Sequence, residues 1–260
     1  MEYLTERQKN QGSCIKCDVK NARIMKIRNV FIKAWAHRRD LRNLISSIYF
    51  NFHYLPFKDA IKLPILLYKP KLLSMKGKVK IEGSVRYRMI RMGFPTVSLY
   101  PNSGITYENL GGTIVFKGMC LIGNNSAMSI GPKGNVCFGQ DFVSTTTLRL
   151  TSYDSIKFGD RCLLGWDCIL LDTDFHKLTK LSGGYSNGHS PISIGADNWF
   201  SNGCRIMKRT VTPNHCVISA GTTLAGIVDV PEYSVISGIQ EIRAKAHGVW
   251  WNIQDDSIEY

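Results

Sequence analysis

The chain has 260 residues, of which 44% are hydrophobic and 20% charged, a balance that fits one large folded domain or a domain with an extension. The formal net charge is +13, but residues 1–88 hold 20 Lys and Arg against 6 Asp and Glu, whereas residues 89–260 hold 13 against 14. Because the basic excess is confined to the N-terminal third, we expect a local anionic contact there, such as a membrane surface or an acidic glycan, and no nucleic-acid-binding core. The alternative is a solvated basic extension.

The N-terminal stretch predicts neither a secretory signal nor a membrane span. The opening MEYLTERQKNQGS is polar and lacks the apolar core of a signal peptide. The longest uncharged apolar stretch nearby, NLISSIYFNFHYLPF, has 15 residues and contains Asn, His and Pro, so it is too short and too polar to cross a bilayer. We therefore expect a cytoplasmic protein, with peripheral contact at the inner face of the membrane as a further expectation.

Two segments are predicted before the main domain. Residues 1–24 form a polar tail, in which Cys14 and Cys17 make a C-x-x-C pair. That pair lacks the second pair of a structural zinc site and the context of a redox motif, so we interpret it as incidental. Residues 25–75 form a basic helical extension.

Within this extension, residues 41–55 predict a helix with one apolar face. The residues of that face are Leu41, Leu44, Ile45, Ile48, Tyr49, Phe52 and Leu55. The face either packs against the main domain or, helped by Arg38, Arg39 and Arg42, lies in a membrane interface.

A short repeat organises the chain from residue 76 to residue 240. Segments rich in Val and Ile, separated by Gly and Asn, predict strands, and no long amphipathic helix is expected here. Apolar residues recur at every sixth position in two runs, and a fixed short period predicts a solenoid. The runs are Phe158, Leu164 and Leu170, then Ile194, Phe200, Ile206, Thr212, Ile218 and Leu224. Three hexads would supply the three short strands of one triangular coil, and about five or six coils are expected, stacked at about the ordinary strand spacing of 4.8 Å.

The same register accounts for most of the cysteines. Five of the eight cysteines occupy the fifth, small position of a hexad: Cys120, Cys162, Cys168, Cys204 and Cys216. We therefore expect small buried hydrophobic residues and neither a metal cluster nor a disulfide framework. A reduced state agrees with the expected cytoplasmic location.

The hexads and the C-terminal run, which includes IGADNW, VISAGT and VPEYSVISG, resemble the hexapeptide-repeat acyltransferases. The resemblance covers about 60% of the chain. It implies a mainly β fold, a left-handed parallel β-helix over residues 76–240, with the N-terminal helical extension before it. It also implies homotrimers, with acyl-CoA in a groove between neighbouring subunits. Residues 241–260 are expected to form a capping tail, in which Trp250 and Trp251 either cover the last coil or stack on adenine.

One interruption of the period, residues 172–191, corresponds to the active-site loop that the resemblance implies. Its segment DTDFH places Asp172, Asp174 and His176 together. In the family a loop histidine acts as general base, so His176 is the candidate base and Asp172 or Asp174 the carboxylate that orients it. A neutral imidazole with a pKa near 6.5 can take the proton of an attacking hydroxyl. His189, on the returning arm of the loop, either binds acceptor or caps the loop.

The resemblance also assigns residues to the acyl donor. The matching positions include Gly203, Ser219, Ala220 and Gly221, where small residues let the CoA arm lie along the backbone. Trp199 matches a tryptophan that lines the cleft used by acceptor or pantetheine, and the alternative is an aromatic residue that packs at the trimer contact. The family commonly has a Thr-Lys pair before the Val-Pro turn, and here the pair is replaced by Ala225 and Gly226. Arg243 or Lys245 is the expected substitute for the phosphate contact of that lysine.

Together these observations predict an acetyl-CoA-dependent acyltransferase that modifies a hydroxyl or amino group, most simply a hydroxyl. The expected acceptor is a sugar, a nucleotide sugar or a polysaccharide intermediate, and no metal is expected. The competing hypothesis is a non-catalytic β-helix scaffold or binding protein that has lost CoA binding. Measured CoA binding, and acyl transfer compared with His176→Ala, separate the two.

Overall fold

The computed structural model describes residues 42–238 and 249–251 of the chain. The chain divides into two compact units, residues 1–44 and 45–260, and the second unit contains the coil. Arg243 and Lys245, like the predicted polar tail with Cys14 and Cys17, lie outside the described residues.

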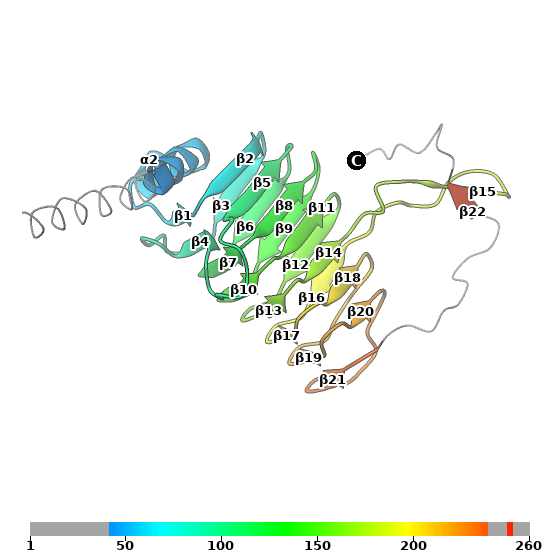
Figure 1. The fold of residues 1–260 in the computed structure, drawn as a ribbon. Coiled ribbons are helices and arrows are strands. Elements are labelled where there is room, and N and C mark those ends of the chain that lie inside the picture. Colours follow the sequence, from blue (N-terminus) through cyan, green and yellow to red (C-terminus); the bar gives the residue numbers. More distant parts are fainter. Residues whose placement is uncertain (1–41, 239–248, 252–260) are drawn as a thin grey trace, which may run out of the picture. The chain divides into compact units, whose positions relative to one another are not determined.

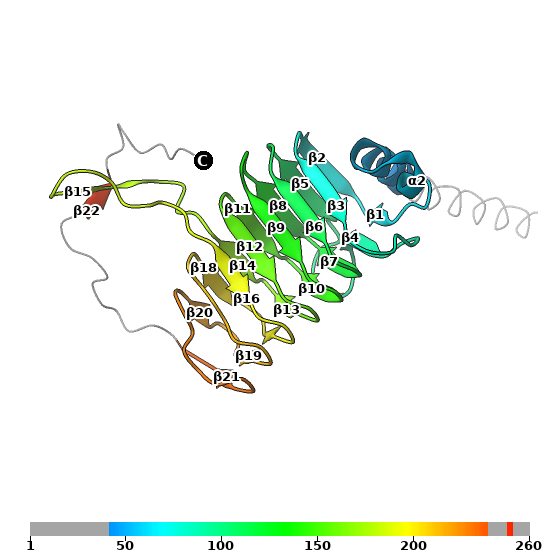
Figure 2. The same cartoon turned by 180° about the vertical axis from the view of Figure 1, so that it is seen from behind.

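The second unit is built around three parallel β-sheets that form the faces of one coil (Figures 1 and 2). The eight-stranded sheet runs in the order β1 (Ile65–Leu67), β4 (Ile90–Phe94), β7 (Cys120–Asn124), β10 (Phe142–Thr146), β13 (Leu163–Trp166), β17 (Trp199–Phe200), β19 (Val217–Ile218) and β21 (Val235–Ile236). The seven-stranded sheet contains β2 (Pro70–Met75), β5 (Ile105–Asn109), β8 (Ser126–Ile130), β11 (Arg149–Ser152), β14 (Ile169–Leu171), β18 (Arg205–Met207) and β20 (Thr223–Leu224). The five-stranded sheet contains β16 (Ile192–Ile194), β12 (Ser155–Phe158), β9 (Asn135–Phe138), β6 (Thr113–Phe116) and β3 (Lys78–Ile81).

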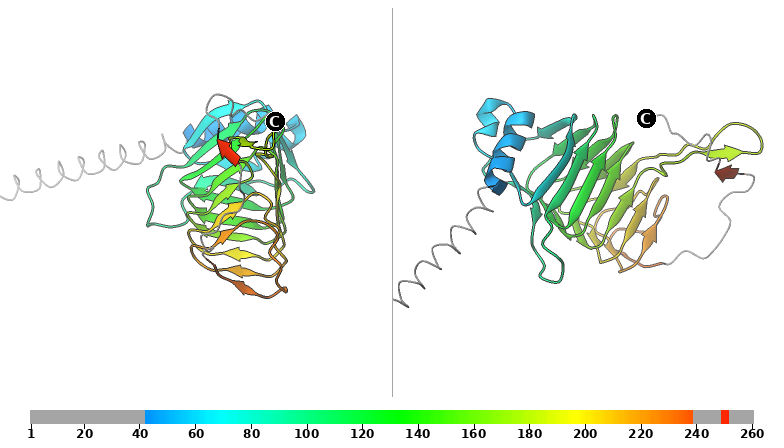
Figure 3. Two further views of the ribbon diagram at one scale, coloured as in Figure 1. Left: turned by 90° about the vertical axis from the view of Figure 1, so that its right-hand side faces the viewer. Right: turned by 45° about the horizontal axis from the view of Figure 1, so that its top comes forward.

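Each turn of the chain visits the three sheets in the same order. Strands β10, β11 and β12 make one coil, and each pairs in parallel with the equivalent strand of the next coil, β13, β14 or β16. The rungs stack along one axis in the side view of Figure 3. This arrangement confirms the predicted parallel β-helix formed by short repeats.

The coil begins earlier and has more rungs than the sequence predicts. Strands β1 and β2 pair with β4 and β5, so the coil starts at Ile65, before the predicted boundary near residue 75. The eight strands of the longest sheet correspondingly exceed the predicted five or six coils. The difference arises because Pro64 immediately precedes β1 and Pro70 is the first residue of β2, two strands that the sequence pattern attributes to the helical extension.

Side chains from successive coils stack in the interior of the β-helix. The rings of Phe116 and Phe138 lie 5.3 Å apart, and those of Phe138 and Phe158 lie 5.5 Å apart, with interplanar angles of 10° and 6°. The five hexad cysteines are all buried and reduced, which confirms their predicted place in the core. The pKa of Cys162, for example, is raised by burial to about 11, so its thiol stays protonated.

The helical segment beside the first coil has its apolar face outward, which excludes the first of the two alternatives, packing of this face on the main domain. Residues 42–54 are helical, and the short helix α2 (Phe57–Ala60) follows. The side that packs against the coil carries Ser47, Phe50 and Asn51, which are buried. Hydrogen bonding by Ser47 and Asn51 to the first strand explains why the more polar side faces inward. None of the helices in the described ranges is long and apolar enough to cross a membrane.

Outside the coil, strand β15 (Leu178–Lys180) pairs in antiparallel fashion with β22 (Val249–Trp251). The register places Leu178 opposite Trp251 and Lys180 opposite Val249. This part of the predicted capping tail therefore pairs with the loop over residues 172–191 and not with the last coil. The sequence contains no periodic signal for such a pairing, because it joins two short segments about 70 residues apart.

Candidate active site

The loop over residues 172–191 leaves the coil between the seven-stranded and the five-stranded sheets. It connects β14 to β16, at the corner where the preceding coil turns directly from β11 into β12. Backbone hydrogen bonds join its two arms at the base, from Ser190 N–H to the Asp172 carbonyl at 2.9 Å and from Asp174 N–H to the Gly188 carbonyl at 2.7 Å. The loop is therefore a paired excursion with a defined stem.

Asp172 is fully buried in this stem. One of its carboxylate oxygens accepts the backbone N–H groups of Tyr153 at 2.9 Å and Asp154 at 2.8 Å, in the corner of the coil beneath. Burial raises the pKa of Asp172, although these N–H groups act in the opposite direction. The predicted role of Asp172 was to orient His176, but the structure places its carboxylate on the backbone of the neighbouring turn.

A second contact ties the returning arm to the same corner. The ring nitrogen Nδ1 of His189 lies 2.8 Å from Oδ2 of Asp154, and both side chains are 28% exposed. The backbone of His189 also forms an isolated bridge with Thr173 on the outgoing arm. The sequence does not predict this histidine–carboxylate pair, because its members are 35 residues apart and meet only through stacking of successive coils.

His176 lies beyond the stem, on the outgoing arm, and is exposed. The other predicted carboxylate, Asp174, forms an ion pair with Lys208 from the following coil, and Lys208 also donates to the Asn187 carbonyl at 3.3 Å. Next to His176, the ring of Phe175 packs edge-on against Tyr153 with 5.0 Å between centroids. The contacts of Asp172, Asp174 and His189 therefore fix the stem of the loop, and His176 lies outside this stem.

The predicted donor-binding residues gather on a different part of the coil. Trp199 begins β17 on the outer face of the eight-stranded sheet and is 48% exposed. It lines a pocket of about 260 Å³ whose other walls are Thr145, Leu163, Gly165, Trp166, Ser201 and Asn202. The walls combine two indole rings with hydroxyl and amide groups and carry no charged side chain.

The small residues assigned to the donor form the adjoining corner between the eight-stranded and seven-stranded sheets. Gly203 and Gly221 both have a φ of 71°, and the N–H of Gly221 donates to the Asn202 carbonyl at 2.9 Å. Ala220 and Gly221 are exposed, and a Cβ on Gly221 would meet no atom within 4 Å. The structure therefore brings Trp199, Gly203, Ser219, Ala220 and Gly221 together along one open edge of the last coils.

A ten-residue excursion over residues 95–104 reaches this edge and was not identified from the sequence. It connects β4 to β5, whereas the equivalent connection from β7 to β8 takes one residue. Ser103 donates to Asn125 at 2.7 Å, and the hydroxyl of Tyr100 donates to the carboxylate of Asp167. The Tyr100 ring packs edge-on against Trp166 at 5.9 Å, next to the Trp166–Trp199 pocket. The signal that could have found this excursion is the long gap it opens between two successive strand repeats.

The departure from the family pattern lies at the end of β20. Ala225 and Gly226 are half-buried, and Gly226 has a φ of 99°, which favours glycine.

No group of three His, Cys, Asp or Glu close enough to hold a metal ion occurs within residues 42–238 and 249–251.

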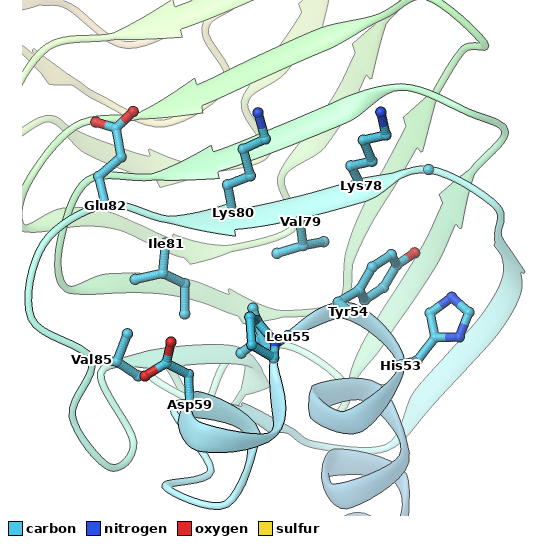
Figure 4. Close-up of a pocket in the computed structure, with 12 residues that line it drawn as sticks. His53, Tyr54, Leu55, Asp59, Lys78, Val79, Lys80, Ile81, Glu82 and Val85 are labelled. Carbon is cyan, nitrogen blue, oxygen red and sulfur yellow. The ribbon is translucent and has the colours of Figure 1, made fainter.

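A further pocket of about 600 Å³ lies where the helical segment meets the first coils. Val79 and Ile81 of β3 point toward Leu55 and the helical turn, whereas Lys78 and Lys80 point to the opposite side of the strand (Figure 4). Its one histidine, His53, contacts the Met75 carbonyl at 2.8 Å. This pocket has no loop excursion like that over residues 172–191, so we do not assign the active site to it.

Comparison with known proteins gives one short sequence match. No protein-family model matches the chain. The acyl-[acyl-carrier-protein]–UDP-N-acetylglucosamine O-acyltransferase of Stenotrophomonas maltophilia (strain K279a) is 38% identical over 77 residues, which cover 28% of this chain and 29% of that relative. The match therefore spans less than a third of either protein. Among solved structures, that of the polySia-specific acetyltransferase NeuO aligns with a TM-score of 0.38 and 13% identity, covering 71% of this chain and 86% of that one.

The hexad repeat and the coil that it forms define the chain as a hexapeptide-repeat β-helix protein. Within that class, the sequence match supports the resemblance to the acyltransferases that the repeat and the C-terminal run indicate.

Proposed function

We propose that this protein transfers an acyl group from a thioester donor to a hydroxyl of a sugar or glycan. The observation that carries the proposal is the loop over residues 172–191, an excursion whose stem is fixed to the coil and whose outer arm exposes His176. Support for the chemistry comes from the matched relative, whose name describes O-acylation of a UDP-sugar.

In this proposal His176 is the general base. Its neutral imidazole takes the proton of the acceptor hydroxyl as the oxygen attacks the thioester carbonyl carbon. The tetrahedral intermediate then collapses, the carbon–sulfur bond breaks, and the imidazolium returns the proton to the departing thiolate. A base in this role contributes about 10²–10⁴ in rate. A backbone N–H of an adjacent coil would stabilise the oxyanion.

We place the donor along the edge formed by Trp199, Gly203, Ser219, Ala220 and Gly221. The open corner beside Gly221 leaves room for an extended chain, and the uncharged pocket at Trp199 suits a neutral group. Acetyl-CoA is the proposed donor. The name of the matched relative contains an acyl-[acyl-carrier-protein] donor. A thioester on an acyl carrier protein is therefore the alternative donor to test beside acetyl-CoA. Arg243 and Lys245 remain proposed contacts to the donor phosphates, and the cytoplasm remains the proposed location.

The predicted donor-binding residues and the loop with His176 lie on different parts of the coil, and this favours a site shared between subunits. Trp199 lies on the outer face of the eight-stranded sheet, whereas the loop with His176 leaves the corner between the other two sheets. If both groups serve one reaction, a second copy of the chain must supply one of them. An outward apolar row on the eight-stranded sheet suits such a contact, and parallel register aligns its members: Leu121, Val143, Leu163, Trp199 and Val217. We therefore propose a homotrimer.

The experiment that tests the proposed function is acyl transfer by the full chain. Acetyl-CoA and an acetylated acyl carrier protein are each incubated with a panel of sugars, nucleotide sugars and oligosaccharides, and the products are measured by mass spectrometry. We expect one donor to give a product heavier by one acetyl group and an equal amount of free thiol. Absence of product and of CoA binding by calorimetry would contradict the proposal and favour the scaffold hypothesis.

A further inference from the structure

The helical segment beside the first coil exposes a surface that is more apolar than its packed side. We call this surface the helical apolar face. It consists of Ile45, Ile48, Tyr49, Phe52, Phe57 and Ile61, whose exposed fractions run from 39% for Ile48 to 71% for Phe57. A soluble helix ordinarily turns its apolar stripe toward the core, so a contiguous apolar surface facing solvent indicates an interaction site.

Specific contacts hold the helix in this orientation. The Oγ of Ser47 accepts the N–H of Leu67 at 2.9 Å. The side-chain amide of Asn51 donates to the Ile65 carbonyl at 2.7 Å, and its oxygen accepts the Ile65 N–H at 3.1 Å. Phe50 packs edge-on against Tyr107 with 5.2 Å between ring centroids. Because Ser47 and Asn51 complete the hydrogen bonds of edge strand β1, the helix cannot turn its apolar stripe inward without leaving buried polar groups unpaired.

The exposed aromatic residues form one continuous patch across the turn between the two helices. The rings of Phe52 and Phe57 lie 5.8 Å apart, and Tyr49 lies one helical turn before Phe52. Lys58 and Lys62 lie on α2 and just after it, on the same segment, and both are exposed. Aromatic rings with flanking lysines are the composition found where proteins meet the headgroup region of a bilayer.

Charge selects between the two candidate occupants, a membrane and a second copy of the chain. Residues 45–88 hold nine Lys and Arg against two Asp and Glu, whereas residues 89–260 hold 13 against 14. Two copies meeting through this strongly basic region would repel each other, but an anionic lipid surface would attract it. This basic excess lies in the helical apolar face and the strands that follow it, residues 45–88.

We propose that the helical apolar face docks on an anionic phospholipid bilayer. Tyr49, Phe52 and Phe57 enter the headgroup region, and Lys58 and Lys62 contact lipid phosphates at its edge. This inference does not depend on the proposed acyl transfer, although an acceptor attached to a membrane lipid would then be held near the coil.

The test is flotation of the full chain with lipid vesicles. We expect co-flotation with vesicles of phosphatidylcholine mixed with phosphatidylglycerol, loss of binding at high salt, and little binding to phosphatidylcholine alone. The double substitution Phe52→Ser and Phe57→Ser should weaken binding by about tenfold or more, since each ring loses its apolar burial. Lys58→Glu with Lys62→Glu should weaken binding to the anionic vesicles.

Matched variants elsewhere control for nonspecific effects. Ile227→Ser with Tyr233→Ser removes apolar side chains that are about as exposed, 80% and 78%, on the last coils. Lys133→Glu changes an exposed charge outside the basic region. Both controls should bind vesicles as the wild type does, and all variants should keep the wild-type unfolding temperature, because the changed side chains are exposed. Equal binding of the Phe52/Phe57 variant and the wild type would overturn the proposal, as would a loss of oligomeric mass in solution caused by that variant.

Discussion

The imidazole of His189 and the carboxylate of Asp154 meet at 2.8 Å and join the returning arm of the loop to the coil beneath it. Asp154 lies in the turn between β11 and β12, and His189 precedes β16, so the contact links two successive coils at the base of the excursion. Together with buried Asp172, this pair fixes how the arm that carries His176 leaves the coil. We interpret His189 and Asp154 as positioning residues.

Substitution of this pair should slow acyl transfer without removing its base. His189→Gln and Asp154→Asn are each expected to lower kcat by roughly tenfold, because misplacement of a reacting group by about 1 Å can cost up to about 10² in rate. Both variants should keep far more activity than His176→Ala, because they retain the proposed base. A larger loss in His189→Gln, with full activity in His176→Ala, would identify His189 as the base instead.

Removal of the Asp172 carboxylate should destabilise the loop stem. Asp172→Ala leaves the N–H groups of Tyr153 and Asp154 without their acceptor, and each buried unsatisfied group costs about 1–3 kcal/mol. The free energy of unfolding, measured in urea, should therefore fall by about 2–4 kcal/mol, and by less in Asp172→Asn, which retains one acceptor oxygen. Asp229→Asn, at an exposed position, is the matched control and should change stability by less than about 0.5 kcal/mol.

The same residue predicts a direction for stability against pH. Burial raises the pKa of Asp172 from its ordinary value of 3.8, so the folded protein holds this proton more tightly than the unfolded chain does. Its contribution to stability is therefore fully present below pH 3.8 and is lost as the pH rises through the folded pKa. Urea unfolding at a series of pH values should show this decline in the wild type and a flatter profile in Asp172→Asn. Identical profiles for the two proteins would contradict the assignment.

Tyr100 should affect binding at the Trp166–Trp199 pocket more than the chemical step. Tyr100→Phe removes the hydroxyl that donates to Asp167 and loosens the excursion over residues 95–104. We expect the KM of donor or acceptor to rise several-fold, as expected for loss of a hydrogen bond worth about 0.5–1.5 kcal/mol, with kcat nearly unchanged. Tyr87→Phe, at an exposed position outside this edge, should leave both constants unchanged. A fall in kcat alone would show that Tyr100 acts elsewhere.

The hexad register was sufficient to predict the coil, because each apolar position must face the interior in every rung. It predicted Phe158, Leu164, Ile194 and Phe200 as core residues and placed Cys162 in the same interior, and all five are buried. The position of the loop followed from the same register, because the period stops after Leu170 in β14 and resumes at Ile194 in β16.

Features that depend on contacts between coils could not be predicted in this way. The pairing of His189 with Asp154 and the reach of Tyr100 to Asp167 join residues 35 and 67 positions apart, and no local pattern encodes either contact. The sequence left two orientations of the helical segment open, because its apolar periodicity is visible in the sequence and the polar contacts of Ser47 and Asn51 that decide between them are not. Those two side chains form hydrogen bonds with the backbone of β1, an edge strand that the sequence pattern did not predict.

The most direct test of the account is the kcat/KM of acyl transfer for the wild type and for His176→Ala, measured with the same donor and acceptor. His176 is exposed beyond the stem, so the substitution should leave the unfolding temperature unchanged. If His176 is the general base, kcat/KM should fall by about 10²–10⁴, the contribution of such a base. Equal kcat/KM for the two proteins would contradict the assignment of His176 and, with it, the proposed mechanism.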